Sequence, residues 1–461
     1  MSALFEYINS KASPTLTFIG ADSKEAITWK ELNSSLPDFK SESKKLAFLY
    51  VDNSLASVKV IIAFLKSNHA FCLLNSNLNE DLKRRLENIY KPDYIFDKDL
   101  NRGDSSKVVY ESGAFKLIEI KQNESPVHKD IKILLSTSGT TGSPKFVKLT
   151  DSNFINNAES ILDYLPINSE DTTILNLPVN YSYGLSVLIT NILKGSRIIC
   201  SNETVLSRNF WNIFKEYNCN NLSGVPYTYE MLVRLGFLKM TGLKLKYMTQ
   251  AGGKLKENTR MIFAEHAKKN DIRFFVMYGQ TEATARMSYL PADKLTEKPG
   301  SIGKPIKNGN FTIDKSTQEL IYSGPNVGCG YAENRMDLSN CEPLAVLHTG
   351  DLAKADEDGF YYITGRLNRF VKLFGNRVSL DELETDLNSV FHGFIGCCGI
   401  EDRMLLIFSD MKNLVPETIC NYVSDKYKIH ISAIKYVSLN EIPLNTNQKV
   451  NYQAVIQEHA G

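Results

Sequence analysis

The sequence has little net charge, no long apolar run and few cysteines and histidines. It carries 53 Lys and Arg residues against 52 Asp and Glu residues among 461, a formal net charge of +1. A broad basic face for nucleic acid and an acidic disordered tail are therefore not expected. No segment approaches the roughly 20 apolar residues of a membrane span, and the first residues lack the pattern of a secretory signal. We therefore expect a cytoplasmic globular protein.

Cysteine and histidine are also scarce. Eight cysteines are too few for a disulfide scaffold in a chain of this length. None forms a C-x-x-C pair, and the adjacent Cys397 and Cys398 are poorly spaced for a mutual disulfide. We expect free thiols in a reducing compartment. The seven histidines show neither H-x-x-H nor H-E-x-x-H spacing, so we expect no zinc or iron site.

What the sequence does have is a regular alternation of apolar runs with helical patterns. Short apolar runs typical of buried strands occur at residues 46–51, 71–74, 94–96, 131–135, 173–177, 197–200, 222–225, 245–249 and 274–277. Apolar residues at helical spacing separate most of them, as in residues 55–65, where Asn53 and Ser54 can cap the helix. This order predicts an α/β protein with mostly parallel, helix-covered sheets.

From about residue 300 the pattern changes. Gly and Pro interrupt short segments, which is typical of hairpins and predicts a small β subdomain. The last 95 residues carry their own short strands and two helical patterns, one starting near Ser379. We therefore predict a large N-terminal domain over residues 1–366 and a small α+β C-terminal domain over 367–461. Because no long linker is visible, the two domains would join at a short hinge around Asn368.

The most specific motif is STSGTTGSPK, residues 136–145, which follows an apolar strand and is expected to precede a helix. Glycines such as Gly139 and Gly142 let the backbone approach an anion closely and turn its N–H groups toward it. Lys145 adds a positive charge. Hydroxyl donors in this segment are Ser136, Thr137, Ser138, Thr140 and Thr141. The spacing differs from that of the ATPase P-loop, and the composition predicts a phosphate-binding loop.

Three other segments carry weaker signals. Tyr278-Gly279-Gln280-Thr281-Glu282 follows a predicted strand, where α/β sheets place ligands. His348-Thr349-Gly350-Asp351 presents a carboxylate that can accept bonds from ribose hydroxyls. Pro443-Leu444-Asn445-Thr446-Asn447-Gln448-Lys449 places a lysine in a turn-rich segment. Taken singly, these segments could equally be a helix start, a turn and a solvated surface lysine.

Together, and in this order, the segments resemble the adenylate-forming superfamily, which includes acyl- and aryl-CoA synthetases, peptide-synthetase adenylation domains and firefly-type luciferases. STSGTTGSPK resembles its phosphate loop and YGQTE its nucleotide and metal motif. TQAGGKL, with Gly252 and Gly253, resembles the strand end beside the adenine. Residues 365–384 resemble the hinge and the start of the small domain. The resemblance covers nearly the whole chain.

The resemblance implies roles for individual residues. Lys449, Lys145 and Thr281 would be catalytic, and Glu282 would bind Mg²⁺. ATP and AMP would contact Thr137, Ser138, Gly139, Thr140, Thr141, Gly142, Lys145, Gly252, Gly253, Tyr278, Gly279, Gln280, Thr281, Glu282, Asp351, Arg366 and Lys449. The acyl pocket and thiol tunnel would be lined by Tyr181, Tyr183, Gly184, Val225, Pro226 and Gly375.

Several positions depart from the family pattern. Phe146 replaces the glycine that usually follows the loop lysine, Asn368 replaces the usual hinge Asp or Lys, and Gln448 precedes the catalytic lysine in place of glycine. Tyr181 stands where the family usually has a histidine that gates the acceptor tunnel. The chain also lacks the Phe-Asp pair with which amino-acid-activating members bind the substrate ammonium. We infer a substrate without a free α-amino group.

The implied reaction has two halves. A carboxylate would attack the α-phosphate of ATP and release pyrophosphate, and a thiol would then attack the acyl adenylate and release AMP. The C-terminal domain would act as a lid that rotates between the halves, with Lys449 serving adenylation. CoA is the first candidate for the thiol, and a carrier-protein phosphopantetheine is the alternative. A non-catalytic nucleotide-binding protein also remains open, whereas a serine hydrolase would lack its G-x-S-x-G elbow.

Overall fold

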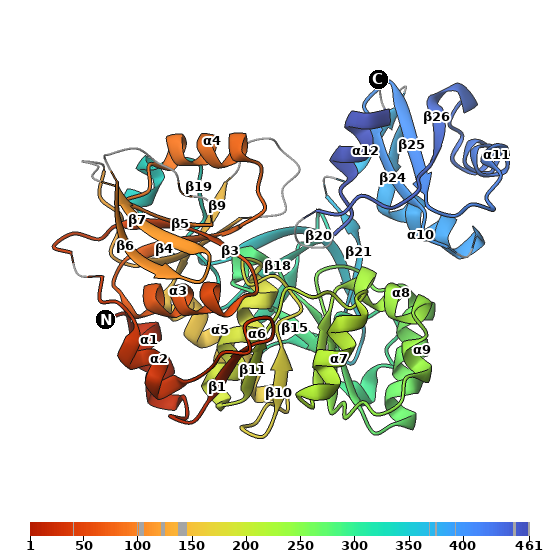
Figure 1. The fold of residues 1–461 in the computed structure, drawn as a ribbon. Helices are drawn as coiled ribbons and strands as arrows, with labels where there is room; N and C mark the ends of the chain where they lie inside the picture. The colour runs from red at the N-terminus through yellow and green to blue at the C-terminus, as the bar shows by residue number, and fades with distance from the viewer. Residues whose placement is uncertain are drawn as a thin grey trace. The chain divides into compact units, whose positions relative to one another are not determined.

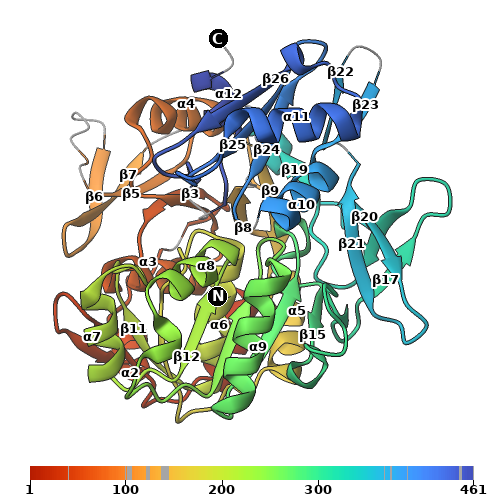
Figure 2. The ribbon, with the colours of Figure 1, turned by 90° about the vertical axis from the view of Figure 1, so that its right-hand side faces the viewer.

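The computed structural model describes residues 1–39, 41–98, 100, 106–120, 125–136, 145–367, 369–373, 376–391, 393–445 and 449–459. The chain divides into two compact units. The N-terminal unit comprises Met1–Phe311 and Tyr322–Leu347, and the C-terminal unit comprises Thr312–Ile321 and His348–Gly461. Figures 1 and 2 show the elements of both units. The predicted domain division after residue 366 stays a prediction, and Asn368 lies outside the described residues.

The largest sheet of the N-terminal unit has eight strands in the order β19-β9-β8-β4-β3-β5-β7-β6. Its strands are β3 (Leu46–Val51), β4 (Ala70–Asn75), β5 (Tyr94–Asp97), β6 (Ser106–Ser112), β7 (Phe115–Ile120), β8 (Ile131–Ser136), β9 (Phe146–Thr150) and β19 (Tyr331–Ala332). The four central strands β8, β4, β3 and β5 pair in parallel. The parallel sheet expected from the alternating pattern is therefore confirmed.

Alternate residues of β3 explain why two helices cover this sheet. Ala47 and Leu49 belong to the same apolar cluster as α3 (Leu55–Lys66), whereas Phe48 and Tyr50 belong to the cluster of α4 (Glu80–Tyr90). Successive side chains of a strand point to opposite faces, so α3 and α4 cover opposite faces of the sheet (Figure 1). The hydroxyl of Ser54 caps α3, as expected from the sequence.

A strand lies between the phosphate-loop motif and the helix that was expected after it. Strand β9 follows the motif and pairs antiparallel with β8, with Ser136 opposite Phe146. Helix α5 (Asp151–Tyr164) begins only after β9, where Thr150 and Asn153 form a capping box. The run Phe146–Thr150 is short and apolar, and periodicity alone does not distinguish such a strand from a helix start.

Two further sheets complete the N-terminal unit. One has the order β10-β11-β1-β2 and the other β12-β13-β14-β15-β16. Their strands are β1 (Thr17–Gly20), β2 (Ala26–Thr28), β10 (Thr172–Ile174), β11 (Arg197–Cys200), β12 (Asn221–Gly224), β13 (Tyr247–Gln250), β14 (Arg273–Tyr278), β15 (Ser288–Leu290) and β16 (Lys304–Pro305). The remaining helices are α1 (Ala3–Lys11), α2 (Trp29–Ser35), α6 (Ser182–Lys194), α7 (Arg208–Glu216), α8 (Pro226–Arg234) and α9 (Glu257–Lys269). Strands β12, β13 and β14 are parallel, and α8 and α9 pack on their sheet (Figure 2).

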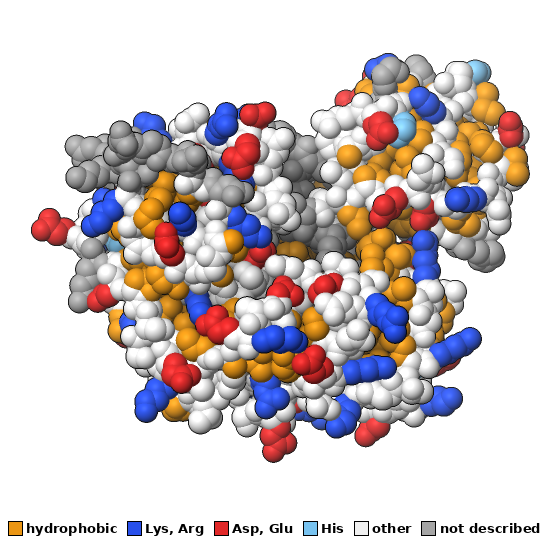
Figure 3. Space-filling view, viewed as in Figure 1, with side chains coloured by type: hydrophobic (Ala, Val, Ile, Leu, Met, Phe, Trp, Pro, Cys, Tyr) orange, Lys and Arg blue, Asp and Glu red, His pale blue; other side chains and the backbone are white. Residues whose placement is uncertain are grey.

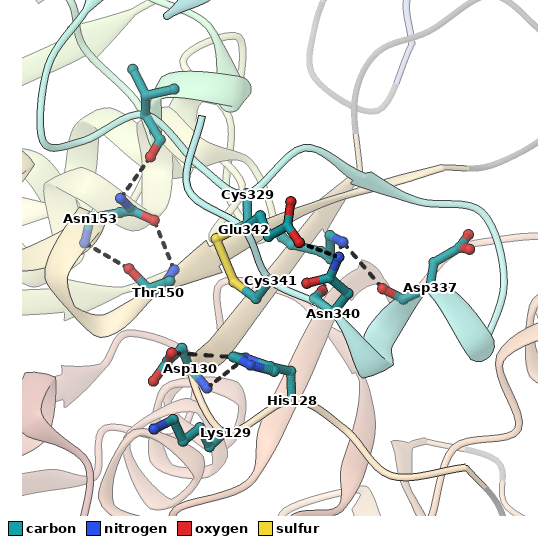
Figure 4. The surroundings of a disulfide bond; sticks show 12 residues. His128, Lys129, Asp130, Thr150, Asn153, Cys329, Asp337, Asn340, Cys341 and Glu342 are labelled. Atoms are coloured by element: carbon teal, nitrogen blue, oxygen red, sulfur yellow. Dashed lines mark hydrogen bonds and ion pairs between the residues drawn. A yellow bond between two sulfur atoms is a disulfide. The ribbon is translucent and has the colours of Figure 1, made fainter. Parts of the chain in front are cut away.

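The expectation that all cysteines are free thiols is wrong for two of them. Cys329 and Cys341 form a disulfide, with their Cα atoms 5.2 Å apart (Figure 4). The other six cysteines are free. The pair lies on either side of β19 and the 3₁₀ helix Met336–Ser339, so the approach of the two thiols results from how the chain folds back there. The separation of 12 residues in the sequence does not by itself indicate that the two cysteines are close in space.

The C-terminal unit contains short strands and, in its described part, three helices where the sequence indicated two. A four-stranded sheet has the order β17-β18-β20-β21, β22 pairs with β23, and a third sheet has the order β24-β25-β26. These elements are β17 (Asn310–Ile313), β18 (Glu319–Ser323), β20 (Leu347–Ala355), β21 (Tyr361–Arg366), β22 (Phe370–Leu373), β23 (Asn376–Ser379), β24 (Gly396–Ile400), β25 (Met404–Ser409), β26 (Ile434–Ser438), α10 (Leu380–Phe391), α11 (Pro416–Tyr427) and α12 (Tyr452–His459). The predicted β subdomain and the α+β unit are both present.

Acidic and basic side chains are interspersed on the face of the N-terminal unit seen in Figure 3. Within the described ranges, no helix is both long and apolar enough to cross a bilayer. The same ranges contain no group of three or more His, Cys, Asp or Glu side chains placed to hold a metal ion.

Candidate active site

Lys145 and Glu282 lie on either side of one tyrosine in the N-terminal unit. The Lys145 Nζ atom is 3.8 Å from the centroid of the Tyr331 ring, and the Tyr331 hydroxyl donates to Glu282 Oε1 at 2.7 Å. Strand pairing explains the approach, because Tyr331 lies opposite Val147 where β19 meets β9. Burial and the charge of Glu282 raise the pKa of Tyr331, so this hydroxyl remains a donor at neutral pH. The structure therefore links the loop lysine to the predicted metal ligand through a residue that the sequence did not single out.

The YGQTE segment turns sharply after β14. A Cβ atom on Gly279 would lie 1.9 Å from the carbonyl oxygen of Ala285, so only glycine fits there. Glu282 lies in a 3₁₀ turn (Thr281–Ala283), and Thr281 Oγ1 is 3.3 Å from the hydroxyl oxygen of Ser182 at the start of α6. The turn presents the Thr281 and Glu282 side chains beyond the carboxyl end of a parallel strand, where α/β sheets bind ligands.

A strained γ-turn holds this segment in place. Thr284 has φ 69° and ψ −61°, and the Ala285 N–H donates to the Ala283 carbonyl at 2.8 Å. The amide of Asn326 donates to the carbonyls of Ala283 at 2.9 Å and Arg286 at 3.1 Å. The Thr284 hydroxyl donates to the Asn326 carbonyl at 2.8 Å. Such strain persists only where neighbours hold it, and Asn326 does so here.

The predicted adenine segment follows β13. Gly252 has φ 87°, a conformation that favours glycine, and the Gln250 amide donates to the Gly253 carbonyl at 2.9 Å. An added Cβ on Gly253 would approach Pro226 Cγ within 3.2 Å. The structure therefore brings Gly253 and Pro226, predicted for two different subsites, next to each other.

Three of the residues predicted to line the acyl pocket, Tyr181, Tyr183 and Gly184, are buried around the start of α6. Tyr181 and Tyr183 are 7% and 3% exposed, and their ring centroids are 6.3 Å apart. A Cβ atom on Gly184 would lie 2.2 Å from the Pro178 carbonyl oxygen, which excludes larger residues. The Tyr183 hydroxyl is 2.7 Å from Thr249 Oγ1. Val225, which precedes α8, is fully buried.

Sequence reasoning missed Arg286, which contacts Tyr183 of this cluster. Its guanidinium is 4.8 Å from the centroid of the Tyr183 ring, and the residue is 2% exposed. A single arginine among the apolar residues of ARMSYL, four positions after Glu282, was the signal in the sequence. The other missed residue, Tyr331, lies 49 positions from its partner Glu282, and no local pattern indicates that contact.

Asp351 and Arg366 meet in the C-terminal unit. They are opposite each other in the antiparallel pair β20–β21, and Arg366 Nε donates to Asp351 Oδ1 at 3.0 Å. Asp351 is 3% exposed. Glu319 braces the turn before it, accepting from the Gly350 N–H at 2.9 Å and bonding His348 Nδ1 at 2.9 Å. The two predicted ribose residues are thus neighbours, while their roles stay predictions.

Lys449 lies directly before Val450, one of two residues that form a short antiparallel contact near the C-terminus. Leu444 and Val450 form an isolated β-bridge, and the backbone N–H of Lys449 donates to Asn445 Oδ1 at 3.0 Å. The remaining predicted positions lie outside the described residues. They are Thr137, Ser138, Gly139, Thr140, Thr141, Gly142, Asn368 and Gly375.

Glu282 fits the modest demands of a Mg²⁺ site. This ion commonly takes one or two carboxylates and completes its shell with water and substrate phosphates. Glu282 offers one partly exposed carboxylate, oriented by Tyr331 and close to Lys145, which could neutralise the phosphates themselves.

Comparison with known proteins assigns the chain to a family. Residues 38–332 match the family described as AMP-binding enzyme. The oxalate–CoA ligase of Arabidopsis thaliana is 26% identical over 271 residues, which cover 56% of this chain and 52% of that protein. The 2-succinylbenzoate–CoA ligase of Bacillus cereus is 25% identical over 434 residues, 88% of this chain and 86% of that protein. The chain thus spans about half the length of the first relative and most of the second.

Solved structures show the same fold. The o-succinylbenzoate coenzyme A synthetase of Bacillus subtilis, in complex with AMP, superposes with a TM-score of 0.74. It is 20% identical, with 98% of this chain and 97% of that chain covered. The resemblance of the five sequence segments is therefore confirmed at the level of the family and the fold. The chain belongs to the AMP-binding enzyme family.

Proposed function

We propose that the protein activates a carboxylic acid without a free α-amino group as an acyl adenylate and transfers the acyl group to a thiol, CoA in the first place. The observation that carries this proposal is the Lys145–Tyr331–Glu282 contact beyond the end of β14, in a chain of the AMP-binding family. Both named relatives are CoA ligases. A carrier-protein phosphopantetheine remains the alternative acceptor.

In the first half-reaction, a carboxylate oxygen bonds to the α-phosphorus of ATP and the bond to pyrophosphate breaks. Lys145 and Lys449 would offset the negative charge that develops there, which is preorganised electrostatic stabilisation. Mg²⁺ bound with ATP supplies further neutralisation, and Glu282 would hold it. Asp351 would accept hydrogen bonds from the ribose, with Arg366 beside it. In the second half-reaction, the thiol sulfur attacks the acyl carbonyl and AMP leaves.

The charge around the predicted acyl pocket supports the choice of acid. A substrate ammonium needs a carboxylate partner when it is buried. The ionised side chain that contacts Tyr183 is instead a cation, Arg286. An arginine would repel an ammonium, so an acid without an amino group fits this pocket better. We also propose a cytoplasmic location, because six of the eight cysteines are free thiols.

The test separates the two half-reactions. With ATP and a panel of short, medium and aryl carboxylic acids, the parent enzyme should release pyrophosphate with at least one acid. Lys449→Ala should then lose about 10²-fold or more in that rate, the scale of one preorganised donor. Given the pre-made acyl adenylate and CoA, the same variant should form thioester at close to the parent rate. Lys412→Ala, which removes an exposed lysine of the same unit, is the control.

Two results would contradict the proposal. Absence of ATP–pyrophosphate exchange with every acid would favour a non-catalytic nucleotide-binding protein. Equal losses in both half-reactions for Lys449→Ala would mean that this lysine does not serve adenylation specifically. Thioester formation with phosphopantetheinylated carrier protein, but not with CoA, would replace the acceptor and leave the adenylation step standing.

A further inference from the structure

Arg286 is a buried cation whose partners in the described part of the chain are all uncharged. It lies between the γ-turn at Thr284 and strand β15 and is 2% exposed. Its Nη1 atom is 3.2 Å from the Tyr164 hydroxyl and 2.9 Å from Met277 Sδ, and its Nη2 atom is 3.3 Å from Ser186 Oγ. The Nε atom is buried without a hydrogen-bond partner among the described residues. Among the described residues, the guanidinium therefore contacts hydroxyls, a thioether and a ring, but no anion.

Every other buried lysine or arginine in the described ranges contacts oxygens that carry negative charge or belong to backbone carbonyls. Arg260 pairs with Glu257, Arg335 with Asp93 and Lys83 with Asp97. Lys132 donates to three carbonyls, those of Phe64, Ser67 and His69, and Lys148 donates to those of Asp337 and Asn340. Each of these buried cations is thus either paired with a carboxylate or hydrogen-bonded to backbone carbonyls. Arg286 is the exception.

A buried guanidinium without a counter-charge is costly, because removal from water is not offset by attraction to an anion. The cation–π interaction with the Tyr183 ring offsets part of that cost. Burial raises the pKa of Tyr183, so its hydroxyl stays protonated and supplies no negative charge. The remaining charge can be offset by an anion that arrives with the substrate, since Tyr183 belongs to the predicted acyl pocket.

The spacing along α6 separates Arg286 from the reacting centre. Thr281 contacts Ser182, whereas Arg286 contacts Ser186, one helical turn further on. Four residues of helix span about 6 Å. An acid whose reacting carboxylate meets Thr281 and Lys145 would therefore carry its other end past Tyr183 toward the guanidinium. An arginine fork binds a carboxylate with two parallel hydrogen bonds, and Nε is free to take part.

We propose that Arg286 binds a second carboxylate of the substrate, so that the acids activated by this protein are short dicarboxylic acids. The inference rests on the proposed function and names the substrate class of the same site. The Tyr164 and Ser186 hydroxyl oxygens accept from Arg286 and would keep the guanidinium oriented. The chemistry of the first half-reaction is unchanged, because only the distal carboxylate pairs with Arg286.

The test compares each dicarboxylic acid with its monoamide, which has the same length and shape but lacks the second charge. The series runs from succinic to suberic acid, and pyrophosphate release is measured with ATP. For the preferred length, kcat/KM for the diacid should exceed that for the monoamide by about 10²-fold, the scale of a charge-assisted pair. Calorimetry of the diacid and the monoamide with the parent protein should show the same preference.

The variant Arg286→Met removes the charge and keeps the volume. It should lose the preference for the diacid and retain or improve activity with the monoamide. Its melting temperature without ligand should equal or exceed that of the parent, because an unpaired buried cation is removed. Arg286→Lys should restore part of the preference. Arg335→Met, which breaks a buried pair with Asp93 in the same unit, should lower the melting temperature and leave the preference unchanged.

The outcomes are distinguishable. A parent enzyme that adenylates monoamides or simple monocarboxylic acids as well as diacids would overturn the role of Arg286 and leave the proposed function intact. If no acid is adenylated, the proposed function fails, and calorimetry still decides whether diacids bind in preference to monoamides. Equal losses with both acids in a destabilised Arg286→Met variant would show that the arginine is only structural.

Discussion

Two buried or partly buried arginines, one in each unit, have opposite surroundings. In the C-terminal unit, Arg369 donates to Asp381 and makes a two-pronged contact with Glu384, with distances of 2.9 and 2.5 Å. Its guanidinium also lies 4.3 Å from the centroid of the Tyr452 ring. In the N-terminal unit, Arg286 has an equivalent tyrosine contact but no carboxylate partner among the residues that the structure describes.

Because both arginines contact a tyrosine ring, the aromatic contact does not decide the role of either one. Burial alone would lower the pKa of Arg369, but the charges of Glu384 and Asp381 outweigh it and raise the pKa. Arg369 is therefore neutralised within its own unit and serves the fold. Arg286 has its charge available for a ligand, at the cost of stability in the unliganded protein.

The largest effect is expected from Arg369→Leu, which leaves the carboxylates of Asp381 and Glu384 without a cation. Breaking such a pair should cost about 3 kcal/mol of local stability. Hydrogen exchange monitored by mass spectrometry should show faster exchange in α10 and β24, because the Cys397 N–H donates to Glu384. Arg403→Leu, at an exposed position of the same unit, is the control. A loss no larger than that of the control would remove the contrast with Arg286.

A second buried base, His69, avoids the cost of a buried positive charge by losing its proton. Burial and the nearby Lys132 lower its pKa from 6.5 to about 4, and the residue is fully buried. The unfolded state therefore binds more protons than the folded state between about pH 4 and 6.5. Stability contributed by neutral His69 is present above that window and is lost as the pH falls through it, by about 3 kcal/mol in total.

Urea denaturation at a series of pH values between 4 and 7 checks this expectation. His69→Gln should flatten the pH dependence over the window, whereas His430→Gln, at an exposed position, should leave it unchanged. A parent profile whose slope persists in His69→Gln would assign the acid sensitivity to other groups. The protein would then tolerate a protonated base at a second buried position.

The smallest effect is expected at Tyr331, whose ring contacts the partly exposed Lys145. Tyr331→Phe keeps the ring under Lys145 and removes only the hydroxyl that donates to Glu282. One hydrogen bond to a charged group contributes about 1.5 kcal/mol, so the Mg²⁺ concentration for half-maximal pyrophosphate release should rise about 10-fold. Glu282→Gln should raise it at least as much.

Tyr7→Phe provides a matched control, because Tyr7 also donates to a glutamate, Glu159, in the same unit. It should leave the Mg²⁺ titration unchanged. An unaltered titration in both Tyr331→Phe and Glu282→Gln would remove this pair from the metal role. Loss of activity in Tyr331→Phe at saturating Mg²⁺ would instead point to the position of Lys145.

Much of the fold could be read from local pattern. The run 46–51 is strand β3 with the bounds expected, and Ser54 caps the following helix as expected. Both depend on neighbours in the chain, since apolar periodicity and capping act over a few residues. The run 146–150 shows the limit of this reasoning, because five apolar-rich residues suit a strand or a helix start equally well, and pairing with β8 decides between them.

Residue types at fixed spacing were enough to predict the family, the order of the elements and the segments that would carry chemistry. Tertiary structure alone decided what surrounds each side chain. It placed Tyr331 between Lys145 and Glu282, joined Cys329 to Cys341, and buried Arg286 away from any described carboxylate. The free energy of a buried charge depends on the groups that distant parts of the chain bring close to it. Arg286 and Arg369 are therefore of the same residue type but differ in surroundings that only the folded chain creates.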